Sequence, residues 1–379
     1  MRTPSRRLHR HSPHDRARPL WVRSCAIAVI SAVGAMLAAC TPRPASGPAR
    51  ATVPAPPGAP TGTPPPPPAP GRTDPSCAAP LDVPTARISL RPARGQLTIG
   101  VLAGLKDAGD ENLAHLRRLV AILRSRGAEL LIADGDLGDN SESQEALLSA
   151  LASPLAVAAA GMTTPASTAS PAPLPLLVNA GNREVRAELD AAEAALRKKG
   201  VALIDLSHTR VIDLGDALIV GLPGAFERRL LRADGACMYA QSDLDALGAF
   251  FDKLPANAPP ALLVAAVPPR GDGALGLDFS DGQNVGDARL APLITGTRAR
   301  FGLFAQVWEA GGHALDGQGQ RVASGVLSNQ LYVNPGAADR TAWPMNDGTT
   351  STGLAALINV RGAKASYEPI RELPAAARP

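Results

Sequence analysis

Short apolar runs alternate with amphipathic stretches from about residue 81 to residue 379. The apolar runs have the length of buried strands and lie at 97–102, 129–133, 174–178, 201–206, 211–214, 217–222, 261–266, 300–304 and 354–361. Stretches with apolar residues three and four positions apart are typical of helices and lie at 111–126, 143–159, 183–199, 242–253 and 285–294. Strand–helix alternation followed by clustered strands predicts one α/β domain with mixed sheets.

The first 39 residues have a different pattern. Seven arginines and a single acid, Asp15, precede a short apolar run at 25–36, and small residues then lead to Cys40. A basic head, an apolar middle and small residues before a cut site are the parts of a secretory signal. The ending Leu-Ala-Ala-Cys resembles a lipobox, so we predict that residues 1–39 are a lipoprotein signal peptide and that Cys40 carries the lipid. The alternative is an N-terminal anchor helix with an incidental cysteine.

This interpretation predicts where the protein is found. Thr41, rather than Asp, follows Cys40, and in Gram-negative lipoproteins a residue other than Asp at this position permits transfer to the outer membrane. We therefore expect a protein of the bacterial cell envelope that is anchored, in the outer membrane, by the lipid on Cys40.

Removing the signal changes the charge of the chain. The whole sequence has 38 Lys and Arg against 34 Asp and Glu. Without the seven arginines and Asp15, 31 basic and 33 acidic residues remain, a net charge of −2. A nucleic-acid partner is not expected, because it requires a basic surface on the domain itself. Half of the six histidines also leave with the signal, and the remaining ones are His115, His208 and His313.

Residues 40–80 are predicted to be a flexible Pro-rich tether, followed by a domain at 81–379. The tether contains 15 prolines and too little apolar bulk for a core, so an extended conformation is favoured. Cys77, at its end, and Cys237 are the two cysteines after Cys40. In an exported protein such a pair is a candidate disulfide. Two free thiols, or pairing with another chain, are the alternatives.

Five segments, in order, resemble motifs of the calcineurin-like metallophosphoesterase family. They are Ala-Asp-Gly-Asp-Leu-Gly-Asp-Asn at 133–140, Asn-Ala-Gly-Asn-Arg-Glu at 179–184, the apolar run and Pro-Pro at 262–269, Phe-Ala-Gln-Val-Trp-Glu-Ala at 304–310 and Val-Asn-Pro-Gly at 333–336. The resemblance covers most of residues 97–362. It implies a four-layer αββα fold, in which two mixed β-sheets are sandwiched between helices and a two-metal site lies at the strand ends.

The resemblance also implies seven metal ligands, of which this sequence keeps two. The bridging aspartate corresponds to Asp136 and the asparagine to Asn182. The other ligand positions, and the family's leaving-group histidine, are occupied by Gly104, Lys106, Ala266, Gln306, Trp308 and Arg183, the last replacing that histidine. Four ligand histidines are needed, and no remaining histidine lies in a ligand segment. We therefore expect no catalytic residues, no cofactor and no dimetal hydrolysis, in which paired metals activate a bridging water.

Two of the substitutions introduce positive charge. Lys106 and Arg183 lie at strand ends where the family has histidines. They either neutralise the carboxylate of Asp136 in an internal ion pair that closes the old site, or form a pocket that binds a phosphate or carboxylate. The indole of Trp308 can fill the volume of the missing metals, which favours closure.

Two further features are weaker candidates. Asp134, Asp136 and Asp139 lie on one loop and suggest a single Mg²⁺ or Ca²⁺ ion bound by oxygens, although acids on a Gly-containing turn are more typical of turn formers. His115 is expected at the surface of the first helix and His208 at a strand edge.

The leading hypothesis is a degenerate, non-catalytic metallophosphoesterase-like domain, acting as an envelope-anchored binding or structural module. Its partner would be an unknown envelope protein or a small anionic ligand. The alternatives are a phosphoesterase with a reduced or atypical metal site, and a sensor that binds phosphate or another anion.

Overall fold

The computed structural model describes residues 76–81, 86–90, 95–153, 173–296 and 299–372. All of them belong to one unit, residues 68–379. The expected signal peptide, Cys40 and the tether up to residue 75 lie outside the described residues. None of the described helices is long and apolar enough to cross a membrane.

The first sheet has six strands in the order β18-β17-β2-β3-β4-β5. Their bounds are Lys364–Arg371, Leu354–Arg361, Leu97–Ala103, Leu130–Asp134, Leu176–Asn179 and Leu203–Asp205, respectively. The strands β2 to β5 are parallel, whereas β17 and β18 form an antiparallel hairpin at the β2 edge. β2, β3 and β4 are buried along their whole length, as expected for parallel strands covered on both faces.

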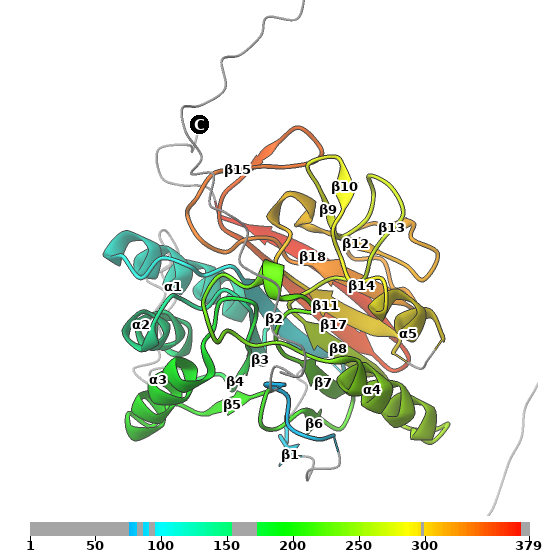
Figure 1. Ribbon diagram of the computed structural model, residues 1–379, viewed down its shortest axis with the longest axis horizontal. Coiled ribbons are helices and arrows are strands. Elements are labelled where there is room, and N and C mark those ends of the chain that lie inside the picture. Colours follow the sequence, from blue (N-terminus) through cyan, green and yellow to red (C-terminus); the bar gives the residue numbers. More distant parts are fainter. Residues whose placement is uncertain (1–75, 82–85, 91–94, 154–172, 297–298, 373–379) are drawn as a thin grey trace, which may run out of the picture. The chain divides into compact units, whose positions relative to one another are not determined.

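Three helices cover the outer face of this sheet (Figure 1). They are α1 (Asp110–Ser125), α2 (Ser141–Ala152) and α3 (Arg186–Lys198). α2 begins where the loop after β3 ends, because the side chain of Asn140 accepts a hydrogen bond from the backbone N–H of Ser143 and so satisfies a free donor of the first turn. α2 ends at Ala152, earlier than the expected residue 159.

The second sheet has eight strands in the order β1-β6-β7-β8-β11-β14-β12-β13. Their bounds are Ala86–Arg87, Val211–Asp213, Leu218–Leu222, Ala261–Ala265, Phe301–Phe304, Leu331–Asn334, His313–Leu315 and Arg321–Val322. The central strands β7, β8, β11 and β14 are parallel. The helices α4 (Gln241–Lys253) and α5 (Leu290–Gly296) lie on the side away from α1 to α3 (Figure 1).

The expected fold class is confirmed by three apolar cores that separate four layers. One core joins α1, α2 and α3 to the first sheet, one lies between the sheets, and one joins the second sheet to α4 and α5. Short pieces complete the fold: β9 (Phe279–Ser280), β10 (Gln283–Asn284), β15 (Trp343–Pro344), β16 (Thr350–Ser351) and the 3₁₀ turns η1 (Arg228–Leu230) and η2 (Trp308–Ala310).

One expected helix was placed too early. The helix predicted at 285–294 begins at Leu290, and β10 with a loop precedes it. The buried carboxylate of Asp278 explains the difference, because it accepts hydrogen bonds from the backbone N–H of Gly286 (2.8 Å) and from the side-chain amide of Asn284 (2.8 Å). These bonds hold the chain in a loop where the apolar spacing alone favoured a helix.

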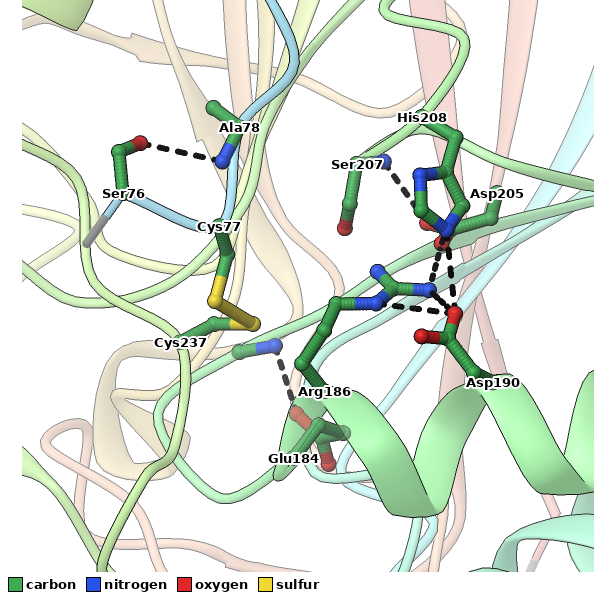
Figure 2. The surroundings of a disulfide bond; sticks show 11 residues. Ser76, Cys77, Ala78, Glu184, Arg186, Asp190, Asp205, Ser207, His208 and Cys237 are labelled. Carbon is green, nitrogen blue, oxygen red and sulfur yellow. Dashed lines mark hydrogen bonds and ion pairs between the residues drawn. A yellow bond between two sulfur atoms is a disulfide. The ribbon is translucent and has the colours of Figure 1, made fainter.

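Cys77 and Cys237, the pair suggested from the sequence, form a disulfide across 160 residues of sequence (Figure 2). The backbone N–H of Cys77 also donates to the carbonyl of Met238, at 3.1 Å, and that of Ala79 to the carbonyl of Ser207, at 2.8 Å. The N-terminal end of the described domain is therefore held against the segment that precedes α4.

Candidate functional site

The loops at the carboxyl ends of β2, β3, β4, β8 and β11 meet at one place. The backbone N–H groups of Leu105 and Lys106 donate to the carbonyl of Asp136, both at 3.0 Å. A Cβ added at Gly181 would come within 2.9 Å of the Gly135 Cα and 3.4 Å of the Ala266 Cβ. The strand ends thus gather the positions that the resemblance assigned to metal ligands.

The backbone of these loops is strained. Of the four non-glycine residues with positive φ in the described part of the chain, three are Lys106 (51°), Asp136 (51°) and Gln306 (65°). This left-handed conformation costs roughly 1–2 kcal/mol for an L-residue with a Cβ. Such strain clusters at functional sites. The loops after β2, β3 and β11 therefore keep an unusual shape although, of these three residues, only Asp136 corresponds to a ligand that the resemblance implies.

Lys106 fills the centre of the site. Its Nζ lies 4.0 Å from the centroid of the Trp308 ring and 3.8 Å from that of Trp343, close enough for cation–π attraction. The indole N–H of Trp343 donates to Asp339 Oδ1 at 3.3 Å. Burial lowers the pKa of Lys106, and the carboxylates of Asp339 and Asp136 oppose this shift. We call Lys106, Trp308 and Trp343 the lysine cage.

Arg183 is the second cation at the strand ends. Its Nε lies 3.4 Å from Asp136 Oδ1, and its Nη1 contacts the exposed carboxylate of Asp139. Burial raises the pKa of Asp136, while the charges of Arg183 and Lys106 lower it. An ion pair of this kind offsets the cost of burying a lone carboxylate.

The side chains at the two retained ligand positions have different partners. The side-chain amide of Asn182 donates to the carbonyl of Leu230, at 2.6 Å, whereas Asp136 pairs with Arg183. Asp134 is fully buried and accepts a hydrogen bond from Asn179 Nδ2 at 2.8 Å. Burial raises the pKa of Asp134 to about 7.

These residues do not fit a two-metal centre. Lys106 and Arg183 are cations, and Ala266 and Gly104 have no ligand atoms in their side chains. A Cβ at Gly104 would also lie 2.6 Å from Trp308 Cζ3, so the indole occupies the space beside that position. The loop acids expected to suit one Mg²⁺ or Ca²⁺ ion have separate partners, namely Asn179 and Arg183.

Glu184 is a site residue that the ligand pattern did not single out. Its two carboxylate oxygens accept the backbone N–H groups of Leu137 and Gly181, both at 2.6 Å. Burial, assisted by the charge of Asp136, raises the pKa of Glu184 to about 7. Its own carbonyl accepts the backbone N–H of Cys237 at 3.1 Å. Glu184 therefore joins the β3 and β4 loops to the disulfide-bonded segment.

Two further residues near Lys106 come from a part of the sequence that carries no recognisable motif. Asp339 and Trp343 follow the Asn-Pro-Gly segment, and nothing in their spacing indicates that they approach Lys106. A cavity of about 480 Å³ lies beside them and is lined by Asp107, Gly109, Asp110, Glu111, Asn112, Asp339, Arg340 and Thr341. Four carboxylates against one guanidinium make this cavity unfavourable for anions.

The expectation for His115 was wrong. Its side chain is buried and packs beneath Gly353, where an added Cβ would lie 2.2 Å from the His115 Nε2. The neighbouring arginines suggested an exposed face, but the β17–β18 hairpin, which is distant in sequence, covers this side of α1.

A second group of polar side chains lies where α3 meets the end of β5. Asp190 on α3, Asp205 on β5 and His208 offer three ligand atoms within 4.8 Å of one another. Arg186 approaches the same two carboxylates (Figure 2). We call these four residues the α3–β5 cluster. The sequence placed His208 at a strand edge but did not connect it with acids.

No protein-family model and no curated protein matches this chain. Among solved structures, one crystal structure aligns with a TM-score of 0.50 and 14% identity, over 72% of this chain and 98% of that one. A protein of Thermus thermophilus (TM-score 0.45, 14% identity, 73% and 100% covered) and a dimetal phosphatase from Danio rerio (TM-score 0.42, 11% identity, 73% and 98% covered) are also similar. At such identities, a likeness concerns the fold and not the activity.

Proposed function

We propose that this chain is a non-catalytic binding or structural module of the cell envelope, built on a metallophosphoesterase-like domain whose metal centre has been replaced by side-chain cations. The observation that carries the proposal is the lysine cage. The Lys106 ammonium lies between two indole rings, at 4.0 and 3.8 Å, at a strand end where the family resemblance requires a metal ligand.

The ligand chemistry supports this proposal. Two-metal hydrolysis needs carboxylates and imidazoles that hold both ions and a water between them. At the strand ends the imidazole positions are occupied by Lys106, Arg183, Ala266, Gln306 and Trp308. The remaining carboxylate, Asp136, is paired with Arg183.

An anion-binding sensor at the same place is less well supported. Both of its proposed contacts, Lys106 and Arg183, already have partners. A phosphate or carboxylate would have to separate Arg183 from Asp136 and Asp139, and would approach those acids closely. Among the described residues, no geometric observation favours a phosphoesterase with a reduced metal site.

The envelope assignment rests on the sequence. The signal at 1–39 and the lipidation of Cys40 lie outside the described residues. The Cys77–Cys237 disulfide supports export, because disulfides persist mainly in oxidising compartments. The lipid would attach the domain to the membrane, and the attached domain would bind an envelope protein.

Enzyme assays on the purified protein test the absence of catalysis. We expect no hydrolysis of p-nitrophenyl phosphate or its bis ester with added Mn²⁺, Zn²⁺ or Fe²⁺. Turnover that disappears in the Asp136→Ala variant would contradict the proposal. Arg126→Ala is a matched surface control, because Arg126 pairs with Glu368 away from the strand ends.

The anchoring is tested separately by fractionation of cells that express the chain. We expect wild-type protein in the outer-membrane fraction and Cys40→Ser protein in the soluble periplasmic fraction. Membrane retention of the Cys40→Ser variant would contradict lipid anchoring and leave the conclusion about catalysis untouched.

A further inference from the structure

The α3–β5 cluster brings together donor atoms from three parts of the chain. Asp190 lies on α3, Asp205 ends β5, and His208 follows in the next turn. The His208 Nε2 is 3.0 Å from Asp190 Oδ1 and 3.7 Å from Asp205 Oδ2. Figure 2 shows the imidazole and both carboxylates pointing toward one another.

These spacings suit a tetrahedral metal ion. Zinc binds imidazole nitrogen and carboxylate oxygen at about 2.0–2.2 Å, which places neighbouring ligand atoms about 3.4 Å apart. The observed separations of 3.0 and 3.7 Å lie on either side of that distance. A mixed set of nitrogen and oxygen donors favours a transition ion over Mg²⁺ or Ca²⁺, which prefer oxygen ligands alone.

Asp205 supplies a second, independent observation. Its side chain is fully buried, and its Oδ2 faces the cluster, where Arg186 Nη2 lies 2.5 Å away. Its other oxygen accepts the backbone N–H of Ser207, at 2.7 Å. The charge on Oδ2 is balanced by Arg186, whose Nη2 contacts both Asp205 and Asp190. The guanidinium is therefore the cation that the chain itself places between these two carboxylates.

We propose that Asp190, Asp205 and His208 form a binding site for one Zn²⁺ ion, and that Arg186 occupies the position of the ion when zinc is absent. Zinc would take one oxygen from each aspartate and the Nε2 of His208, which leaves the fourth position for water. The Arg186 side chain, 22% exposed, would have to turn toward solvent as zinc enters.

Equilibrium dialysis of the chelator-treated full chain against Zn²⁺ alone tests this proposal. We expect one saturable equivalent that depends on His208. Since loss of an outer partner of a metal ligand costs about 10–100-fold in affinity, His208→Ala and Asp190→Asn, which remove ligands themselves, should each weaken binding at least about tenfold. Arg186→Met should tighten it, because the competing cation is removed.

Two variants serve as matched controls. His313→Ala removes a partly buried histidine outside the cluster, and Asp245→Asn removes an exposed helical aspartate; both should leave zinc binding unchanged. Asp205 is not a useful target, because its buried carboxylate also holds the Ser207 backbone. Three results would overturn the proposal: no saturable zinc uptake by the wild type, uptake that survives both His208→Ala and Asp190→Asn, or equal loss in the controls.

Discussion

Arg183 and Arg186 lie three residues apart, and each contacts two aspartates, yet their surroundings differ. Arg183 pairs with Asp136 and Asp139 at the strand ends, where Lys106 is a second cation. Arg186 pairs with Asp190 and Asp205 in the α3–β5 cluster, where the third group is an imidazole. The two guanidinium side chains are similarly exposed, at 28% and 22%.

Exposure of the arginine therefore does not distinguish the two regions; the neighbouring side chain does. A second cation at the strand ends repels any metal ion, and the indoles of the lysine cage fill the remaining space. An imidazole in the α3–β5 cluster adds a nitrogen ligand that a metal ion can use. We therefore propose metal binding at the α3–β5 cluster and none at the strand ends.

The largest expected effect concerns the disulfide, whose segment is joined to the strand-end loops by Glu184. Replacing Cys77 and Cys237 together by Ala should lower the free energy of unfolding by about 3–5 kcal/mol, since the bond closes a loop of 160 residues. Urea unfolding under oxidising conditions measures this change. Wild-type protein treated with reductant should match the variant, and a loss below about 1 kcal/mol would show that the bond contributes little.

The lysine cage should matter more for stability than the α3–β5 cluster does. Trp308→Ala removes a partly buried indole packed against Trp343 and should cost about 2–4 kcal/mol. His208→Ala removes an exposed ring and should change the metal-free stability by less than about 0.5 kcal/mol. Urea unfolding in the presence of a chelator compares the two variants. Equal losses of unfolding free energy would show that the two regions contribute equally to stability.

Protonation of Asp134 should make the strand-end region sensitive to pH. Burial raises its pKa from 3.8 to about 7, so the folded protein keeps a proton that the unfolded chain releases. The stabilisation is complete below pH 3.8 and is lost as pH rises through about 7. Unfolding measured between about pH 4 and pH 8 should show the decline. In Asp134→Asn, the loss of unfolding free energy between these two pH values should be smaller by about 1–3 kcal/mol. An unchanged dependence of stability on pH would show that Asp134 is not the titrating group.

The smallest expected effect is the loss of stability when either arginine is replaced. Arg183→Met and Arg186→Met should each destabilise the metal-free protein by about 1–2 kcal/mol, below the value for a fully buried pair because both guanidiniums are partly exposed. Added Zn²⁺ should restore the stability of Arg186→Met but not that of Arg183→Met. Thermal unfolding with and without zinc makes the comparison. If zinc stabilised both variants, the strand ends would bind metal as the α3–β5 cluster does, contrary to the prediction.

The fold was predictable because its buried strands carry long apolar runs. Residues 97–102, 129–133 and 261–266 indicated β2, β3 and β8 nearly to the residue. The β10 region was not predictable, because the carboxylate of Asp278 holds a loop by contacts that apolar spacing does not encode.

The candidate site was predictable only in part. The segments at 133–140 and 179–184 located the strand ends and the Arg183–Asp136 pair. Trp343 reaches Lys106 from a loop whose sequence carries no motif. The α3–β5 cluster joins Asp190 to His208 across a helix and a strand, so the contact depends on tertiary packing rather than on local pattern.

Zinc content of the purified chain and of two variants tests the central comparison most directly. We predict one equivalent of zinc in wild-type protein, one in Asp136→Ala, and none that is tightly held in His208→Ala. Two equivalents in the wild type, with a loss in Asp136→Ala, would contradict it, because the strand ends would then hold metal in spite of Lys106 and Arg183.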